Sequence, residues 1–336
     1  AQGLALHQRA NEWTEVMDHW RDGAAIGGIS GRCRVHRAEM LRMTGPCDAA
    51  EQEALGACDE LRPWMRREFG WPLAELGMIR LRKGDLDGAE DALTAAHRHA
   101  WSPHPGFALL RLEQGDPVAA ASLIREAIEH PLDIPSKERP PFGDLRLAPL
   151  YDAQAAIAEA NGDAATARAA AEHLDRIATA YRSPALHAMV AVASARAALL
   201  DGDADAAAQS ASHGVAGWSD VGAPFETAVT RVVLGRALDA AGRGAAAEME
   251  WRAAADAFTD FGAERWAGIA LDLAQRHGES GVMHAGMTAE RQSESAAMHA
   301  GVTAERHGES GVMPAGVTAE RRGGFRRDGD SRVVSF

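Results

Sequence analysis

The chain has 336 residues, enough for two average domains or one elongated array, and 46% of them are hydrophobic. Its 35 Lys and Arg residues stand against 48 Asp and Glu residues, and the resulting net charge of −13 argues against a general nucleic-acid binder, because it repels a polyphosphate. Two Tyr and eight Phe among abundant Gly and Ala favour helices packed through small side chains over a β-sheet, which draws on aromatic and β-branched residues.

The cysteines and the apolar runs indicate a soluble protein of a reducing compartment. Cys33, Cys47 and Cys58 are odd in number and lack CxxC spacing, so we expect neither a disulfide framework nor a zinc site. The most apolar run, residues 184–200, is interrupted by His187 and Arg196, and no charged-then-apolar leader opens the chain. We therefore expect a cytoplasmic protein with neither a membrane span nor a signal peptide.

The first 22 residues predict an N-terminal capping helix, with the second helix of a lost hairpin as the alternative. Trp13, Met17 and Trp20 fall on one helical face, which favours a core stripe over an aromatic ligand box. The segment "GAAIGGISGR" that follows is rich in glycine but lacks the lysine of a phosphate-binding loop, so it is interpreted as a loop between helices.

Six glycines share their surroundings along the next 250 residues. They are Gly45, Gly84, Gly115, Gly162, Gly202 and Gly242, and Asp85, Asp116, Asp163 and Asp203 directly follow four of them. Seven residues before each glycine the side chain is small, and five residues after it the residue is always alanine. Nine and twelve residues after it there is no charged residue, which predicts a buried face.

This recurring pattern is typical of helical hairpins. Glycine reaches the left-handed conformation that ends a helix, and the aspartate after it accepts hydrogen bonds from the free amides of the next helix. A single hairpin cannot bury its apolar face alone, so such units stack into arrays. The predicted fold is all-α, an α-solenoid of about six tetratricopeptide-like hairpins over residues 23–275, with a long Pro-rich loop near 131–149.

Beyond residue 275 the composition changes. Three tandem copies of a fifteen-residue unit run from His277 to Arg321, and "RGGFRRDGDSRVVSF" follows. Because few of these residues could bury a core, we expect residues 276–336 to be a disordered tail.

No pattern in the chain predicts catalysis. His97, His99 and His104 are interpreted as the end of a helix rather than a metal site, and the pairs Glu51/Glu53 and Asp201/Asp203 as solvated faces. No nucleophile elbow or phosphate loop occurs. We expect no catalytic residue, no cofactor and no metal, and therefore no enzyme.

A helical array offers instead a concave groove lined mainly by the first helix of each hairpin. Counting one and four residues past the small position points to Glu39, Arg42, Met78, Leu81, Arg196 and Arg236 as groove candidates. Arginines at such positions could clamp a peptide carboxylate or an acidic segment, although a solvated helix face is the alternative for each one.

Several segments resemble a known family. "WPLAELGMIRLRKGDLDGAEDALTAAH", "PGFALLRLEQGD" and "CRVHRAEML" are similar to the tetratricopeptide-type region of actinobacterial LuxR-type transcriptional regulators, and the likeness extends over residues 7 to 265. The general tetratricopeptide pattern is matched at Leu76, Gly77, Ala89, Leu93 and Ala96.

The resemblance implies a cytoplasmic regulator whose array binds a protein, a peptide or a small effector and controls a C-terminal helix-turn-helix that reads DNA. Here the fifteen-residue repeats take the place of that domain, and no ATPase module precedes the array. DNA would then be reached only through a domain that this chain lacks. The alternative is a stand-alone adaptor with no part in transcription; the ligand, the oligomeric state and the direction of regulation stay open.

Overall fold

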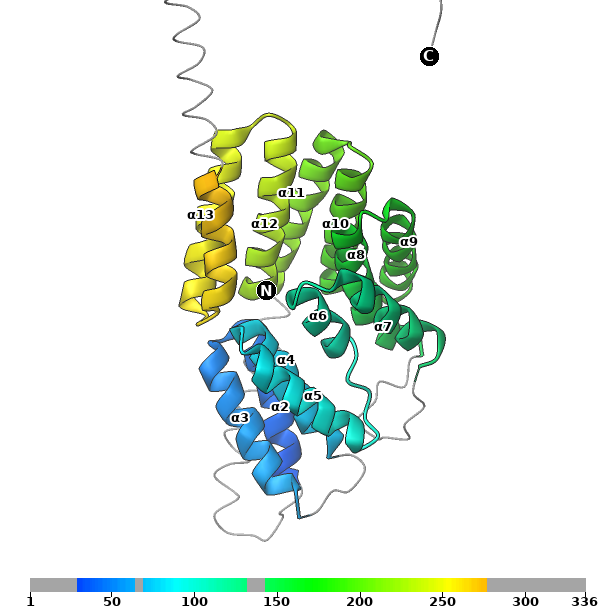
Figure 1. The fold of residues 1–336 in the computed structure, drawn as a ribbon, viewed down its shortest axis with the longest axis vertical. Helices are drawn as coiled ribbons and strands as arrows, with labels where there is room; N and C mark the ends of the chain where they lie inside the picture. The colour runs from blue at the N-terminus through cyan, green and yellow to red at the C-terminus, as the bar shows by residue number, and fades with distance from the viewer. Residues whose placement is uncertain (1–28, 64–68, 132–142, 277–336) are drawn as a thin grey trace, which may run out of the picture. The chain divides into compact units, whose positions relative to one another are not determined.

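The computed structural model describes residues 29–63, 69–131 and 143–276, and within these ranges every regular element is a helix (Figure 1). The elements in chain order are α2 (Ile29–Thr44), α3 (Cys47–Leu61), α4 (Gly70–Lys83), α5 (Leu86–Arg98), α6 (Gly106–Glu113), α7 (Pro117–Glu129), the short 3₁₀ helix η1 (Leu145–Leu147), α8 (Ala148–Asn161), α9 (Ala164–Tyr181), α10 (Pro184–Leu200), α11 (Ala204–Val221), α12 (Pro224–Ala240) and α13 (Gly244–Asp260). A further helix covers residues 264–276.

These helices pair into six hairpins within the described ranges. Each even-numbered helix from α2 to α12 packs against the odd-numbered helix that follows it, and each hairpin then contacts the next along the chain. The prediction of an all-α array of stacked hairpins is confirmed. The expected capping helix over residues 1–22 and the tail after Arg276 lie outside the described residues.

The Gly-Asp pairs form the bends of the hairpins. Five of the six turn glycines have φ between +71° and +90°, a left-handed conformation that favours glycine; they are Gly84, Gly115, Gly162, Gly202 and Gly242. The side chains of Asp85, Asp116, Asp163 and Asp203 each accept a hydrogen bond of 2.9–3.0 Å from the backbone amide three residues later. Glycine ends one helix and aspartate caps the next, as the sequence predicts.

The first bend departs from this pattern. Gly45 does not have a positive φ, and Pro46 follows it as an N-cap without a side-chain hydrogen bond. The bend itself lies where the sequence predicts it, between α2 and α3, and the departure follows from Pro46, because a proline directs the residue before it toward extended backbone. At the last bend Gly242 keeps the left-handed conformation, but Arg243 provides no side-chain cap.

Small side chains hold the two helices of each hairpin close together. The alanines five residues after the turn glycines are all 0% exposed: Ala50, Ala89, Ala120, Ala167, Ala207 and Ala247. A Cβ on Gly77 would lie 2.6 Å from Leu93 Cγ, and one on Gly235 would lie 2.3 Å from Trp251 Nε1. The small position of the first helix thus packs on the buried position of the second helix, nine residues after the bend.

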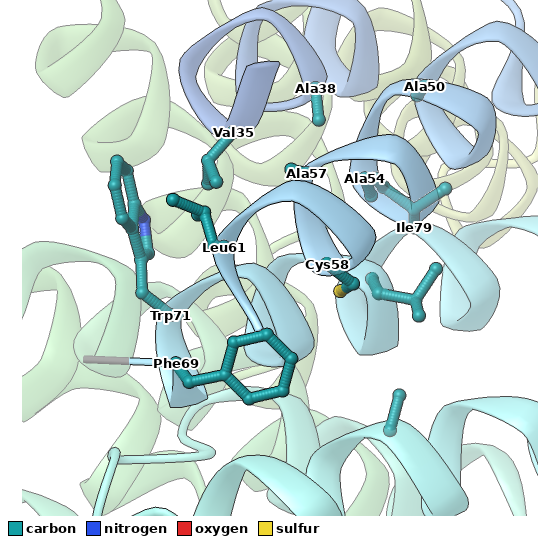
Figure 2. Packing of buried hydrophobic residues seen from close by; sticks show 12 residues of the cluster. Val35, Ala38, Ala50, Ala54, Ala57, Cys58, Leu61, Phe69, Trp71 and Ile79 are labelled. Atoms are coloured by element: carbon teal, nitrogen blue, oxygen red, sulfur yellow. The ribbon is translucent and has the colours of Figure 1, made fainter. Parts of the chain in front are cut away.

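The hydrophobic core is divided among the hairpins. In the first two of them a layer of alanines on α2 and α3 lets the backbones approach, and larger side chains close the ends of the layer (Figure 2). Leu61 and Ile79 are fully buried there, with Leu61 near Trp71 at the start of α4 and Ile79 near Ala54 (Figure 2). Several clusters combine residues of one hairpin with residues of the next, and the sixth hairpin packs on the helix over residues 264–276 in the same way.

The first helices form a closed ring. α2, α4, α6, α8, α10 and α12 contact one another in sequence, and α12 also contacts α2. The amide of Cys47 donates to the carbonyl of Phe261 at 2.9 Å, and Met43 of α2 packs on a cluster formed by α10, α11 and Ala223, the residue before α12. Arg265 donates to the carbonyl of Glu113 at 2.7 Å. The array therefore closes on itself, which no local repeat pattern predicts.

Two predicted loops are shorter in the structure. The Gly-rich segment ends in helix, because α2 begins at Ile29. The Pro-rich segment near 131–149 contains η1 and the beginning of α8 at Ala148, and its residues 132–142 lie outside the described ranges.

The bend glycines can be tested by replacing Gly202 with alanine. Gly202 has φ +77°, and a Cβ there would meet nothing within 4 Å, so Gly202→Ala introduces backbone strain without a steric clash. We expect a loss of about 1–2 kcal/mol in the free energy of unfolding, measured by urea denaturation. The control is Gly268→Ala in the helix over 264–276, where the space is also open and the change should stabilise by roughly 0.5–1 kcal/mol. Equal effects at the two sites would contradict the turn assignment.

Candidate functional site

The ring of first helices carries a set of charged side chains, most of which form an ion pair with a side chain on another first helix. We call this set the inner charged cluster. It comprises Glu39 and Arg42 of α2, Glu75 and Arg82 of α4, Asp152 and Glu159 of α8, Arg196 of α10, and Glu226 and Arg236 of α12.

One part of the cluster joins α2 to α4. The guanidinium of Arg42 donates to Glu75, whose side chain is 8% exposed, and the indole of Trp71 donates to Glu39 at 2.9 Å. Burial alone would lower the pKa of Arg42, but the carboxylates of Glu75, Glu226 and Glu39 together outweigh burial and hold that pKa above its usual value. Burial likewise acts to raise the pKa of Glu39, but the hydrogen bonds from His36 and Trp71 lower it overall. Both carboxylates are satisfied by partners within the protein.

Arg82 of α4 joins three helices. Its guanidinium donates to the carbonyl of Arg42 at 2.6 Å and to the carboxylate of Glu226, and its Cζ lies 4.4 Å from the centre of the Phe225 ring. Burial lowers the pKa of Arg82, and the Glu226 carboxylate opposes that effect. A planar guanidinium suits this position, because one face stacks on an aromatic ring while its edges donate hydrogen bonds. Arg82 thereby ties the second hairpin to the sixth.

The other part of the cluster joins α8 to α10 and α12. Glu159 is 4% exposed at its side chain, and it receives the guanidinium of Arg196 on one oxygen. Its second oxygen, Oε1, lies 3.0 Å from Arg236 Nη1 without the geometry of a hydrogen bond. Two arginines thus converge on one buried carboxylate.

Asp152 differs from every other member of the inner charged cluster. It is partly exposed, and no hydrogen bond or ion pair within 4.0 Å engages its carboxylate in the described part of the chain. Burial raises the pKa of Asp152 to about 6, and the charge of Glu226 adds to that effect, whereas Arg196 and Arg82 oppose it. Asp152 is therefore a carboxylate that the folded protein leaves without a direct partner.

The predicted groove residues fall into two groups. Glu39, Arg42, Arg196 and Arg236 belong to the inner charged cluster, where each arginine already faces a glutamate. Met78 is half-buried beside the start of α6, and Leu81 is 4% exposed in a cluster with Ala89, Leu93 and Leu110. Leu81 is thus a core residue, because the fourth residue past Gly77 turns toward α5 and α6.

The sequence reasoning missed Asp152, Arg82, Glu226, Glu75 and Glu159. A signal for Asp152 is present in the repeat, because it stands ten residues before its turn glycine, where the other five hairpins have an apolar residue. Those five are Val35, Ala74, Pro105, Val192 and Val232. A lone charge at a position that is otherwise apolar marks a departure from pure packing.

Other candidates have structural roles. Glu51 receives Arg80 at 2.8 Å and Lys83 at 2.9 Å, and Glu53 receives Arg34 at 2.9 Å, so this pair joins α3 to its neighbours rather than forming a solvated face. The carboxylates were misjudged because the partners lie on other helices. His97 is in the last turn of α5 and His99 is its C-cap, as predicted.

The cysteines and histidines form no metal-binding group within the described ranges. Cys47 and Cys58 are buried free thiols, and burial raises the pKa of Cys58 to about 11, which makes it a weak nucleophile. Within the described ranges, no group of three or more His, Cys, Asp or Glu residues is arranged to hold a metal ion.

Comparison with known proteins does not identify a family. No family model matches the chain, and no curated protein matches it. Among the helices that the structure describes, none combines the length and the apolar character that a membrane crossing requires. The site geometry therefore carries the functional argument.

Replacing Arg82 tests the closure of the ring. Arg82→Met leaves Glu226 as an uncompensated charge and the Arg42 carbonyl without its donor, so we expect a loss of about 3–5 kcal/mol in unfolding free energy. The control is Arg243→Met, whose ion pair with Asp205 is exposed and should contribute at most about 1 kcal/mol. Adding Glu226→Gln to Arg82→Met should restore part of the loss. Equal losses in the two single variants would contradict the role of Arg82.

Replacing Asp152 tests its electrostatic surroundings. The pKa of Asp152 is about 6 in the folded protein, above its ordinary value of 3.8, so the ionised carboxylate destabilises the fold at pH 7. Protonation removes this destabilisation as the pH falls through 6 toward 4. Asp152→Asn should therefore raise the unfolding free energy at pH 7 by up to roughly 3 kcal/mol, with a smaller gain at pH 4.5. Asp205→Asn, at an exposed site of α11, should change it by less than about 0.5 kcal/mol. A pH-independent gain would show that charge is not the cause.

Proposed function

We propose that the chain is the tetratricopeptide-like interaction and effector-sensing module of a LuxR-type transcriptional regulator. It acts in the cytoplasm by binding a protein segment or a small effector on the ring of first helices, without chemistry of its own. DNA is reached through a helix-turn-helix domain that this chain does not carry in recognisable form.

One observation supports this proposal: the residues that match the tetratricopeptide pattern are also the ones through which the helices pack. Leu76, Gly77, Ala89, Leu93 and Ala96 match the tetratricopeptide pattern, and all five are buried at helix contacts in the second hairpin. The repeat uses these positions to nest helices through small side chains, which is the arrangement that makes such arrays interaction surfaces. The inner charged cluster gives the first helices a polar side, in contrast to the apolar side that packs in the core.

A stand-alone adaptor is the second candidate. It is favoured by the sequence after the array, where a fifteen-residue unit repeats three times in place of a DNA-reading domain. Such an adaptor would use the same surface, but its partner would have no link to transcription.

Site-specific crosslinking in the native host separates the two. A photoreactive residue at position 236, where the Arg236 side chain is 46% exposed, would report partners of the first helices. The same residue at position 168, where Arg168 of α9 is 57% exposed, serves as a control on a second helix. If the chain is a module of a transcriptional regulator, the photoreactive residue at position 236, and not the one at position 168, should capture a DNA-binding protein, an RNA polymerase subunit or a small effector. Capture of proteins unconnected with transcription from position 236 favours the adaptor, and equal capture from both positions contradicts a specific surface.

The purified chain alone should not bind DNA in a sequence-specific way. Its net charge of −13 opposes the phosphate backbone, and the resemblance ends before a DNA reader. A gel-shift assay with genomic fragments should therefore show no retarded band at physiological salt. A tight and sequence-specific complex would contradict the proposal that the reader lies outside this chain.

A further inference from the structure

The interfaces between successive hairpins are apolar. Each of them, from the first hairpin to the sixth, contains a hydrophobic cluster with buried members on both sides. Leu81 of α4 shares a cluster with Leu110 of α6, for example, and Ile124 of α7 shares one with Ile157 of α8. Separating two such hairpins would expose these side chains to water, which is unfavourable in proportion to the apolar area exposed.

The contact that closes the ring is polar. We call it the closing seam, and its polar members are Cys47, Arg82 and Glu113 on one side and Glu226, Phe261 and Arg265 on the other. Backbone atoms form one part of it, since the amide of Cys47 donates to the carbonyl of Phe261 at 2.9 Å. Charged side chains form the rest: Arg82 pairs with Glu226, and Arg265 donates to the side chain of Glu113 at 3.2 Å and to its carbonyl at 2.7 Å.

The hydrophobic core is interrupted at the closing seam. In the part of the chain that the structure describes, no hydrophobic cluster has buried members both on the first two hairpins and on the sixth. Met43, which is half-buried, packs from α2 on the cluster of α10, α11 and Ala223, and the Arg82 guanidinium covers the Phe225 ring at 4.4 Å. The closing seam therefore differs in kind from the interfaces between successive hairpins.

The charges of the closing seam are kept from water at a cost. Glu226 Oε2 is buried and accepts no hydrogen bond, although Oε1 of the same carboxylate receives Arg82. Burial lowers the pKa of Arg82 and raises the pKa of Glu113, because water would stabilise the charged form of each group. When the seam opens, the hydration that these groups regain offsets much of the ion pairing that they lose. Opening the ring here therefore costs less than separating two hairpins at an apolar interface.

We propose that the closing seam is a gate. The ring opens there reversibly into an arc, while the hairpins and the apolar interfaces between them stay intact. Arg82 and Glu226 belong both to the seam and to the inner charged cluster, so opening gives a ligand access to that cluster. This use of the gate rests on the function proposed above, whereas the opening itself does not. High salt favours the open arc, because screening weakens the attraction between the charges of the seam.

The amide of Cys47 reports the state of the gate. Cys47 is the first residue of α3, and the first amides of a helix have no partner in their own helix, so this amide is protected only while it is bonded to Phe261. Cys58 lies inside α3, and its amide is released only when the helix itself unfolds. The chain has three cysteines, so selective isotope labelling of cysteine gives three amide signals in NMR, which Cys33→Ala and Cys58→Ala variants assign.

Hydrogen exchange of the labelled full chain in deuterated buffer tests the gate. We expect the Cys47 amide to exchange roughly a hundredfold faster than the Cys58 amide, yet more slowly than an unprotected amide. Raising NaCl from about 0.1 M to about 1 M shortens the screening length from about 10 Å to about 3 Å, and it should accelerate the exchange of Cys47 by roughly threefold. The exchange of Cys58 should change by less than about twofold in the same buffers.

A matched pair of variants assigns the protection to the closing seam. Arg265→Gln removes a cation of the seam whose side chain is 40% exposed, so the protein should stay folded. We expect this variant to accelerate the exchange of Cys47 by roughly threefold to tenfold and to leave Cys58 unchanged. Arg252→Gln removes an exposed arginine whose partner, Glu248, lies on the same helix, and it should leave both amides unchanged.

Any of four results would overturn the inference: Cys47 exchange as slow as Cys58 exchange, Cys47 exchange at the unprotected rate, Cys47 exchange that does not respond to salt, or equal effects of Arg265→Gln and Arg252→Gln. The first would mean that the ring opens only by unfolding, and the second that it is open throughout. Each would leave the proposed function standing, because crosslinking at position 236 detects a partner whether or not the gate moves. Failed crosslinking together with selective, salt-dependent exchange of Cys47 would instead overturn the regulator proposal and keep the gate.

Discussion

The close approach of two helix backbones in every hairpin is the constraint on which the rest of the structure depends. It requires alanine five residues after the bend, because a larger side chain at a position with 0% exposure would push the second helix outward. The small residue on the first helix has the same role from the other side, as Gly77 against Leu93 shows. The same contact recurs in successive hairpins, and the stack of hairpins brings α12 back into contact with α2.

The closed ring brings together first helices that are far apart in the chain. The side chains of the inner charged cluster lie where these helices meet. Arg82 and Glu226 are separated by 144 positions in the sequence, yet they form one ion pair beside Phe225. Such buried pairs add little net stability compared with apolar packing, but they are costly to break, so they fix which helices meet. The cluster thus sets the register of the closure and, through Asp152, retains a charge that packing alone does not need.

Much of the fold could be predicted from the sequence because its signals are local. The left-handed glycine, the aspartate cap and the buried alanine act within one hairpin, so Gly84 to Ala96 reveal their structure without reference to the rest of the chain. Gly45 departs from the pattern because a proline follows it, and that proline is itself visible in the sequence. The candidate site was only half anticipated: Arg196 and Arg236 were placed on the right helices, but their partner Glu159 belongs to another hairpin, and pairing across hairpins depends on the closure that no local pattern contains.

The contact between the first and the last hairpins also changes how the array should open. In a linear stack the terminal units have one neighbour each and fray first, so backbone amides there exchange with solvent faster than those in the middle. Here the amide of Cys47 is bonded to the carbonyl of Phe261, and each end covers the other. The contacts between neighbouring hairpins, rather than the terminal hairpins, then open most easily. A ligand or partner that enters would move neighbouring hairpins apart about a hinge instead of unfolding a terminal hairpin.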